Sequence, residues 1–132
     1  MMTMPWLNLT ITLALLQALV FGVLVGRARG KYGVKAPATT GHEMFDRYYR
    51  VQMNTIELLL LLVPAAYLAE GLLGDCYSAI AVAVYLVGRV LYLRGYVADP
   101  SKREVGFVLS VVPVLVLIIA SLWHNGRTLL AG

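Results

Sequence analysis

The sequence predicts an all-α integral membrane protein, a four-transmembrane-helix bundle formed by residues 1–132 as a single domain. Of these residues 60% are hydrophobic and only 14% are charged, and the mean hydropathy is +0.77. A water-soluble domain of this length needs far more polar surface to cover its core. The apolar residues also fall into long runs separated by short charged or glycine-containing loops. We therefore expect membrane-spanning helices at about residues 6–26, 41–72, 76–97 and 102–124.

Composition excludes several classes of function. The formal charge of +4 is spread over loops and helix ends and forms no basic tract, so nucleic acid is not an expected partner. Cys76 is the sole cysteine and cannot form an internal disulfide. No metal-ligand spacing surrounds Cys76, His42 or His124, and no metal is predicted.

The first predicted helix is the apolar span from Trp6 to Gly26, about the 20 residues that cross a bilayer. No basic segment precedes it and no small-residue cleavage site follows it, so we expect a retained helix rather than a signal peptide. The second predicted helix begins after Thr40, where Glu43 three residues later completes a capping-box pattern. Its length of roughly 48 Å exceeds a bilayer core of about 30 Å, so its charged first turns should stand in the interface. Pro64 should kink it.

The third predicted helix contains Arg89 deep within an apolar run. An arginine inside a membrane helix marks a functional site or a buried ion pair, and Glu57 is its candidate partner. Tyr85, Tyr92 and Tyr96 share a helix face with it. These tyrosines either form an interfacial belt or line a pocket with Arg89, and we favour the pocket.

The fourth predicted helix follows a second capping-box pattern, from Ser101 to Glu104. The pattern places Arg103 in the first helical turn, beside backbone N–H groups that have no partner within the helix. Lys102 and Arg103 also fit a simpler role as positive charges that set the topology. Pro113 is expected to bend this helix.

A polar stripe opens the second helix. Arg50, Asn54 and Glu57 are spaced i, i+4 and i+7, so they project from one face, and Arg47 extends that face by one turn. The apolar run that follows places Glu57 in nonpolar surroundings, where an unpaired carboxylate costs several kcal/mol. The stripe indicates either a polar pocket between helices or structural ion pairing of Arg50 and Glu57 with each other or with a neighbouring helix.

The basic residues predict the topology. The loops at about residues 27–37 and 98–104 hold six of the eleven lysines and arginines, whereas the loop near residue 75 holds none. The positive-inside rule places these two basic loops in the cytoplasm and both termini outside. Arg29, the start of the second helix, the end of the third helix and Arg103 then share the cytoplasmic level.

Three segments of the sequence carry a resemblance to a known family. They are Thr39-Thr40-Gly41 with Phe45-Asp46-Arg47 and Arg50-Val51-Gln52-Met53-Asn54-Thr55-Ile56-Glu57; Arg89-Val90-Leu91-Tyr92 with Gly95-Tyr96; and Arg103. Together they resemble the MAPEG family, the membrane-associated proteins in eicosanoid and glutathione metabolism. The resemblance covers nearly the whole chain, is of the microsomal glutathione transferase type, and points to a bacterial inner-membrane member.

The resemblance implies a homotrimer that binds glutathione, as co-substrate, between neighbouring subunits near the cytosolic surface. It implies that the tripeptide is held by Arg29, Arg50, Gln52, Asn54, Glu57, Arg89, Tyr92 and Tyr96. Arg103 would be the catalytic residue that activates the thiol, and Ser101 is a second catalytic candidate because its hydroxyl is able to donate to sulfur. Arginines suit the two carboxylates of glutathione, and Glu57 suits its ammonium group.

The expected activity is conjugation of the glutathione thiolate to lipophilic electrophiles, as in detoxification, and some family members also reduce lipid hydroperoxides. Leu58 stands where leukotriene C synthase has a tyrosine, and Gly30 lacks the second adjacent arginine of that enzyme, so a general transferase fits better. Two other classes are a non-catalytic lipid-binding scaffold of the same family and a small four-helix multidrug transporter. Arg103 and the complete polar stripe disfavour the scaffold, and the arginines near Glu57 disfavour the transporter.

Overall fold

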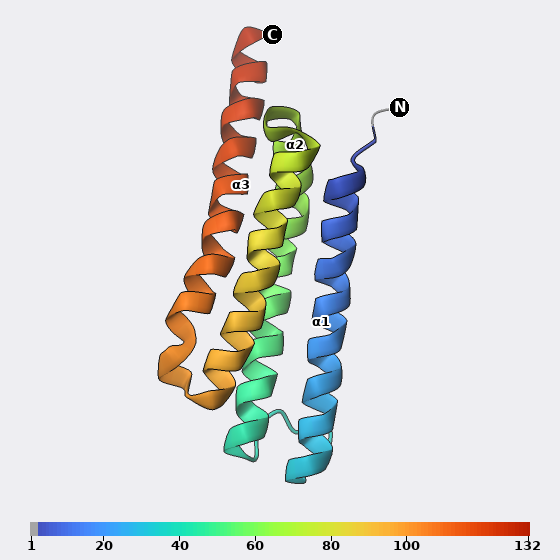
Figure 1. The fold of residues 1–132 in the computed structure, drawn as a ribbon, viewed down its shortest axis with the longest axis vertical. Coiled ribbons are helices and arrows are strands. Elements are labelled where there is room, and N and C mark those ends of the chain that lie inside the picture. The colour runs from blue at the N-terminus through green and yellow to red at the C-terminus, as the bar shows by residue number, and fades with distance from the viewer. Residues whose placement is uncertain (1–2) are drawn as a thin grey trace.

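The computed structural model describes residues 3–132, and this part of the chain is helical without a strand. It consists of α1 (Pro5–Tyr32), α2 (Glu43–Ala98), the short 3-10 helix η1 (Pro100–Arg103) and α3 (Glu104–Ala131) (Figure 1). α1, α2 and the segment Pro100–Ala131 are each long and apolar enough to cross a membrane.

α2 turns back on itself at Gly74. This residue has φ 77° and ψ 171°, angles that glycine adopts without the steric cost of a Cβ. Figure 1 shows residues 75–98, the second half of α2, returning beside residues 43–73, the first half. The expected boundary between the second and third helices therefore falls at Gly74, whereas the backbone angles at Pro64 stay helical.

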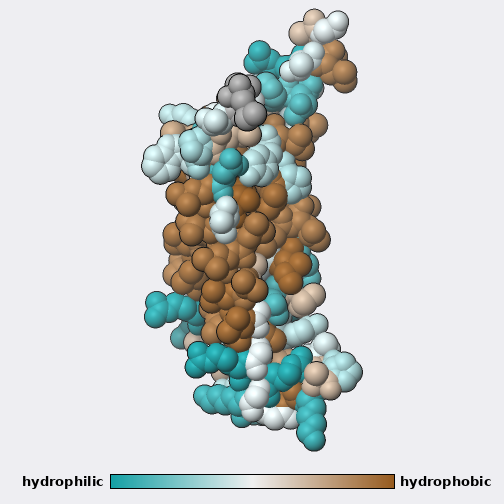
Figure 2. All heavy atoms as spheres, turned by 90° about the vertical axis from the view of Figure 1, so that its right-hand side faces the viewer, coloured by the Kyte–Doolittle hydropathy of each residue, from teal (hydrophilic) through white to brown (hydrophobic). Residues whose placement is uncertain are grey.

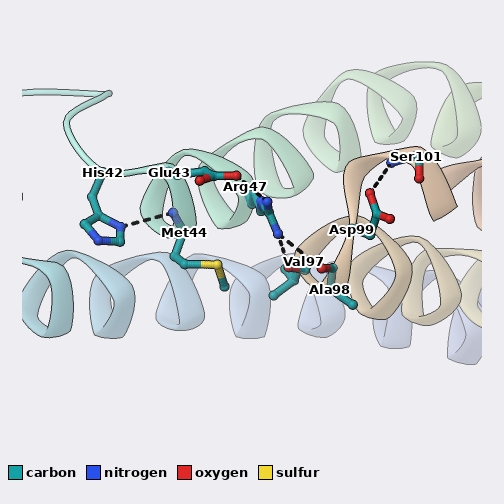
Figure 3. A network of polar contacts seen from close by, with 8 residues as sticks. All are labelled: His42, Glu43, Met44, Arg47, Val97, Ala98, Asp99 and Ser101. Atoms are coloured by element: carbon teal, nitrogen blue, oxygen red, sulfur yellow. Dashed lines mark hydrogen bonds and ion pairs between the residues drawn. The ribbon is translucent and has the colours of Figure 1, made fainter.

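The capping box predicted at the start of α2 is wrong. The N-cap is His42, whose Nδ1 accepts a hydrogen bond from the backbone N–H of Met44 at 3.1 Å (Figure 3). Thr40 instead donates its hydroxyl hydrogen to Asp46 Oδ2 at 2.9 Å. The Gly41 N–H also donates to Asp46, so this carboxylate draws the preceding loop toward itself and leaves the cap position to the histidine.

The capping box predicted before α3 is also wrong, because Asp99 and not Ser101 is the cap. Asp99 Oδ1 accepts the Ser101 backbone N–H at 3.0 Å (Figure 3). That hydrogen bond, with a smaller effect of the Ser101 hydroxyl, lowers the pKa of the Asp99 carboxyl. Pro100 follows at the first helical position, where its fixed φ favours a helix start. The chain therefore enters η1 first, and α3 begins at Glu104, after the predicted start at residue 102.

α1 is tied to α2 at two levels. Asp75, in the turn of α2, accepts the backbone N–H groups of Trp6 at 3.1 Å and Leu7 at 2.8 Å, and so caps the start of α1. Near mid-helix, Gln17 Nε2 donates to the backbone carbonyl of Leu86 at 2.9 Å. The core between α1, α2 and α3 includes the fully buried Leu7, Leu62, Ala66, Tyr85 and Leu117.

The second half of α2 and α3 cross at backbone contact distance. A Cβ added to Gly106 would lie 2.2 Å from the backbone nitrogen of Tyr92, and one added to Gly88 would lie 2.7 Å from the carbonyl carbon of Leu109. Only residues without a side chain permit this approach, which is typical of helix packing in membranes. Since Arg89 adjoins Gly88, the crossing also fixes Arg89 against α3.

Gly106→Ala is expected to destabilise the protein by about 1–3 kcal/mol, because its methyl group forces the α2 and α3 backbones apart. Gly126→Ala, in the same helix, is the matched control, since no atom lies within 4 Å of its added Cβ. The control should leave stability unchanged or raise it by up to about 1 kcal/mol through helix propensity. Unfolding of detergent-purified protein followed by circular dichroism measures both, and equal behaviour of the two variants contradicts a tight crossing.

The surface is apolar across the middle of the molecule and polar at both ends. Figure 2 shows this hydrophobic band with hydrophilic residues above and below it. The start of α1 and the end of α3 lie at one pole, and the α1–α2 and α2–α3 connections lie at the other (Figure 1). We call the second pole the loop end.

Candidate functional site around Arg89

Arg89, in the second half of α2, is fully buried among polar groups from two other helical segments. Its Nε donates to Ser110 Oγ of α3 at 2.8 Å. Its Nη1 donates to Asn54 Oδ1 at 2.8 Å and to Thr55 Oγ1 at 3.3 Å, both on the first half of α2. The guanidinium thus joins α3 to both halves of α2.

The acceptors around Arg89 are themselves oriented. Ser110 Oγ donates its hydrogen to the Gly106 carbonyl at 2.6 Å, and Thr55 Oγ1 donates to the Val51 carbonyl at 2.8 Å. Their oxygen lone pairs are therefore directed to the arginine. Nη2 of Arg89 is buried and has no hydrogen-bond partner among residues 3–132. The network holds a positive charge on neutral acceptors and leaves one buried donor without a partner among residues 3–132.

Glu57 is not the partner of Arg89, so that sequence prediction is wrong. Glu57 Oε1 lies 3.7 Å from Arg50 Nη1, and each of these side chains is slightly more than half exposed. The pairing of Arg50 with Glu57, one of the two interpretations left open by their spacing, is therefore present. At this distance and exposure the pair contributes little to stability.

Aromatic rings cover the remaining sides of Arg89. Its guanidinium carbon lies 4.3 Å from the ring centroid of Tyr92 and 5.9 Å from that of Tyr85, in cation–π geometry. Tyr92 packs against Tyr96, with centroids 5.5 Å apart, and against Phe107 of α3. Tyr85 and Tyr92 are buried and Tyr96 is half-buried, so these tyrosines form a wall beside Arg89.

Two further arginines lie close in sequence to residues that pack on this wall. Arg50 adjoins Val51, which shares a buried cluster with Tyr92, and Arg103 lies four residues before Phe107, whose ring packs against Tyr92. Arg103, predicted in the first turn of the last helix, is instead the last residue of η1 and the N-cap residue of α3, and its side chain is exposed. Ser101 is exposed too, and its backbone N–H and hydroxyl are directed to Asp99. Arg103 is therefore the better placed of the two catalytic candidates.

Arg29 and Gln52 face other surroundings. Arg29 Nη1 donates to the Ala38 carbonyl at 2.7 Å, and its guanidinium lies over the ring of Phe45 at 4.8 Å. Gln52 points at α1, with its Nε2 2.7 Å from the position of a Cβ on Gly22. Within one subunit, neither side chain joins the network around Arg89.

Arg47 fastens the start of α2 to its end. Its Nη1 donates to the carbonyls of Val97 at 2.9 Å and Ala98 at 3.2 Å, and its Nη2 bonds to Glu43 (Figure 3). Two carbonyls at the C-terminal end of a helix thus receive a cationic cap. Arg47 thus connects the start and the end of α2 at the loop end. Its spacing in the sequence had placed it on the same helix face as Arg50.

Thr55 and Ser110 were missed by sequence reasoning. The available signal for Thr55 and for Ser110 was a hydroxyl residue within an apolar run. Thr55 also adjoins Asn54, which the sequence did single out. Such hydroxyl groups usually donate to a backbone carbonyl of their own helix, as both do here. Because this bond is so common, the sequence gives no sign that the two oxygens also accept hydrogen bonds from Arg89.

Comparison with known proteins gives a consistent set of relatives. The sequence model of the MAPEG family matches residues 7–123. The chain is 44% identical over 117 residues to an uncharacterized protein of Synechocystis sp., covering 89% of this chain and 85% of that protein. It is 37% identical over 90 residues to human microsomal glutathione S-transferase 2, covering 68% of this chain and 61% of the relative. It is 33% identical over 96 residues to leukotriene C4 synthase of Bos taurus, covering 73% and 63% respectively.

Proposed function

The chain belongs to the MAPEG family, and from this premise we propose that it is a membrane-bound glutathione transferase that joins the glutathione thiolate to a lipophilic electrophile. One observation carries the proposal: Arg89 is buried on neutral acceptors beneath the Tyr92 ring with its Nη2 unpartnered among residues 3–132, and Arg50 and Glu57 stand as a loose pair on the helix that supplies two of those acceptors. Among the matched relatives is a protein named as a glutathione S-transferase.

The charges of this cluster complement those of glutathione, which carries two carboxylates and one ammonium group. Arginine binds carboxylates with charge-assisted hydrogen bonds, and Glu57 offers an anion for the ammonium. The 3.7 Å pair of Arg50 and Glu57 is loose and half exposed, so a ligand with both charges is able to replace each partner by its own group. Nη2 of Arg89 supplies a further buried donor.

Arg103 supplies the chemistry in this proposal. The reaction needs the thiolate, which attacks the electrophile, forms the carbon–sulfur bond and displaces or opens the leaving group. A guanidinium beside the sulfur favours its deprotonated form. Arg103 makes no side-chain hydrogen bond within residues 3–132, so its guanidinium is free to meet the sulfur.

A homotrimer with four membrane crossings per subunit is part of the proposal. Arg50 and Glu57 lie half exposed on α2, directly before its apolar run from Leu58 to Val63, a costly arrangement against lipid that a neighbouring subunit relieves. Arg29 and Gln52 lie apart from the Arg89 network in one subunit, so all the candidate ligands meet one glutathione molecule only if two subunits contribute.

We place the loop end in the cytoplasm and both termini outside, in a bacterial inner membrane. The start of α1 and the end of α3 share one pole in Figure 1, as this topology requires. The basic loop residues gather at the opposite pole, consistent with the positive-inside rule.

The transferase proposal is tested with detergent-purified protein, glutathione and a chloronitroaromatic electrophile, by following the conjugate over the non-enzymatic rate. Calorimetric titration with glutathione alone separates binding from catalysis. Saturable binding with conjugation supports a transferase. Binding without turnover of any electrophile favours a non-catalytic family scaffold, and absence of binding contradicts both.

The oligomer is expected to be a trimer in native mass spectrometry from detergent. Because the proposed site lies between subunits, glutathione should bind the trimer and raise its resistance to dissociation. A monomer or dimer that still binds glutathione is the contradicting outcome.

A further inference from the structure

Two adjoining grooves lie at the loop end between α1 and α2, away from the Arg89 network. One has a volume of about 280 Å³ and is lined by Arg27, Lys31 and Tyr32 of α1. The other has a volume of about 510 Å³ and is lined by Arg47 and Arg94 of α2 among others. Leu24 and Tyr48 line both, so the grooves form one surface, which we call the α1–α2 groove.

The rim of the α1–α2 groove is positively charged and uncompensated. Within residues 3–132 there is no ion pair or side-chain hydrogen bond to Arg27, Lys31 or Arg94. The Lys31 ammonium makes a cation–π contact, 5.4 Å from the Tyr32 ring centroid. No acidic residue lines either part of the groove. The acidic side chains of the adjoining loops are engaged elsewhere: Glu43 with Arg47, Asp46 with Thr40 and Gly41, and Asp99 with Ser101.

The floor of the groove is apolar, and Leu24 and Leu93 line it. Exposed valines precede these leucines in sequence on the two helices, at Val20, Val23 and Val90. Figure 2 shows the α1 side of the molecule, where the hydrophobic band meets hydrophilic residues toward the loop end. Cationic side chains thus stand where an apolar surface reaches the interface.

We propose that the α1–α2 groove binds an anionic phospholipid. The phosphate lies between the cations of α1 (Arg27 and Lys31) and Arg94 of α2, while an acyl chain lies along Leu24 and Leu93. Charge complementarity selects a lipid with net negative charge, and the apolar floor selects a lipid over a free phosphate. None of the groove residues belongs to the Arg89 network, so the proposal does not depend on glutathione transfer.

The test uses delipidated, detergent-purified protein titrated with dioleoyl phosphatidylglycerol or dioleoyl phosphatidylcholine, with bound lipid counted by native mass spectrometry. The variant Arg27→Gln/Lys31→Gln/Arg94→Gln should bind phosphatidylglycerol about 10- to 100-fold more weakly than the unchanged protein. Its binding of phosphatidylcholine should be weak and unchanged.

The control Lys35→Gln/Lys102→Gln/Arg127→Gln removes the same charge from exposed residues outside the groove and should keep its phosphatidylglycerol affinity within a few-fold. Equal loss in both variants shows general surface electrostatics and overturns the proposal. So does equal affinity of the unchanged protein for the two lipids. Competition by soluble glycerol 3-phosphate at the lipid's own concentration identifies a phosphate site and also overturns it. Circular dichroism melting confirms that each variant is folded.

Discussion

Glu57→Gln is expected to weaken glutathione binding about 10- to 150-fold, because a charged hydrogen bond to the ligand ammonium contributes about 1.5–3 kcal/mol. The substitution keeps the size and the hydrogen-bonding capacity of the side chain but removes its charge. Calorimetric titration of the detergent-purified variant measures the effect. Unchanged affinity in folded protein refutes the assignment of Glu57 to the ammonium group.

The geometry of Glu57 separates this role from a structural one. An ion pair of 3.7 Å between half-exposed side chains is worth at most about 1 kcal/mol, so the variant should fold and melt much as the unchanged protein does. Glu70→Gln, near the turn of α2 at the opposite pole, removes the same charge and should leave affinity unaltered. A large loss of stability in Glu57→Gln, without a loss of affinity, assigns the glutamate to the fold.

The all-helical class and the long apolar helices were readable from the sequence because apolar runs of membrane length are hard to mistake. Their ends were not. Thr40 and Ser101 both matched the capping box, yet Asp46 and Asp99, with stronger acceptors, decide the geometry in each case. A capping motif therefore indicates candidate cap residues, and the hydrogen bonds of neighbouring carboxylates determine which residue takes the cap position.

The sequence places candidate residues on one helix face, but it does not determine which of them pair. Helical spacing places Arg50, Asn54 and Glu57 on one stripe, but says nothing of how the second half of α2 is rotated against it. The close crossing at Gly88 and Gly106 sets that rotation, and Asn54 and Thr55, rather than Glu57, then face Arg89. Gly88 and Gly106 permit this backbone contact, but the two glycines do not show from sequence alone that they face each other.

The burial of Arg89 bears on the alternative of a small multidrug transporter. Such a carrier needs a carboxylate that gains and loses a proton within a helix bundle that has no other charged side chains. Here Glu57 is next to Arg50, and the buried charge of the bundle is a guanidinium held by three neutral acceptors. This arrangement favours a binding site for anions.

Arg103→Ala is expected to lower conjugation at neutral pH by about 10²-fold or more, while glutathione affinity stays within a few-fold of the unchanged protein. The tripeptide's own charges are held elsewhere in the proposed site, by Arg50, Glu57 and Arg89. The loss should therefore appear in the rate at saturating glutathione. Steady-state conjugation and calorimetric titration of the same preparation separate the two quantities.

The size of this effect follows from the acidity of a thiol. A thiol with a pKa of about 8.5 is mostly protonated at neutral pH, and the thiolate is the nucleophile. Lowering that pKa by about 2 requires roughly 2.7 kcal/mol of preferential thiolate stabilisation. One guanidinium at contact distance, in surroundings of intermediate dielectric, supplies an energy of this order. The N-terminal end of α3, where Arg103 stands, adds to it in the same direction.

Three comparisons distinguish this role from a general effect of positive charge. Lys102→Ala removes an exposed cation from the same 3-10 helix and should leave the rate nearly unchanged. Raising the pH should restore part of the Arg103→Ala rate, because the solvent then deprotonates the thiol that the guanidinium no longer acidifies. The ultraviolet absorbance of the bound thiolate should disappear in Arg103→Ala at neutral pH and return at alkaline pH. A variant that conjugates at the unchanged rate at neutral pH leaves Arg103 as a topology signal, and the proposed catalytic role then fails.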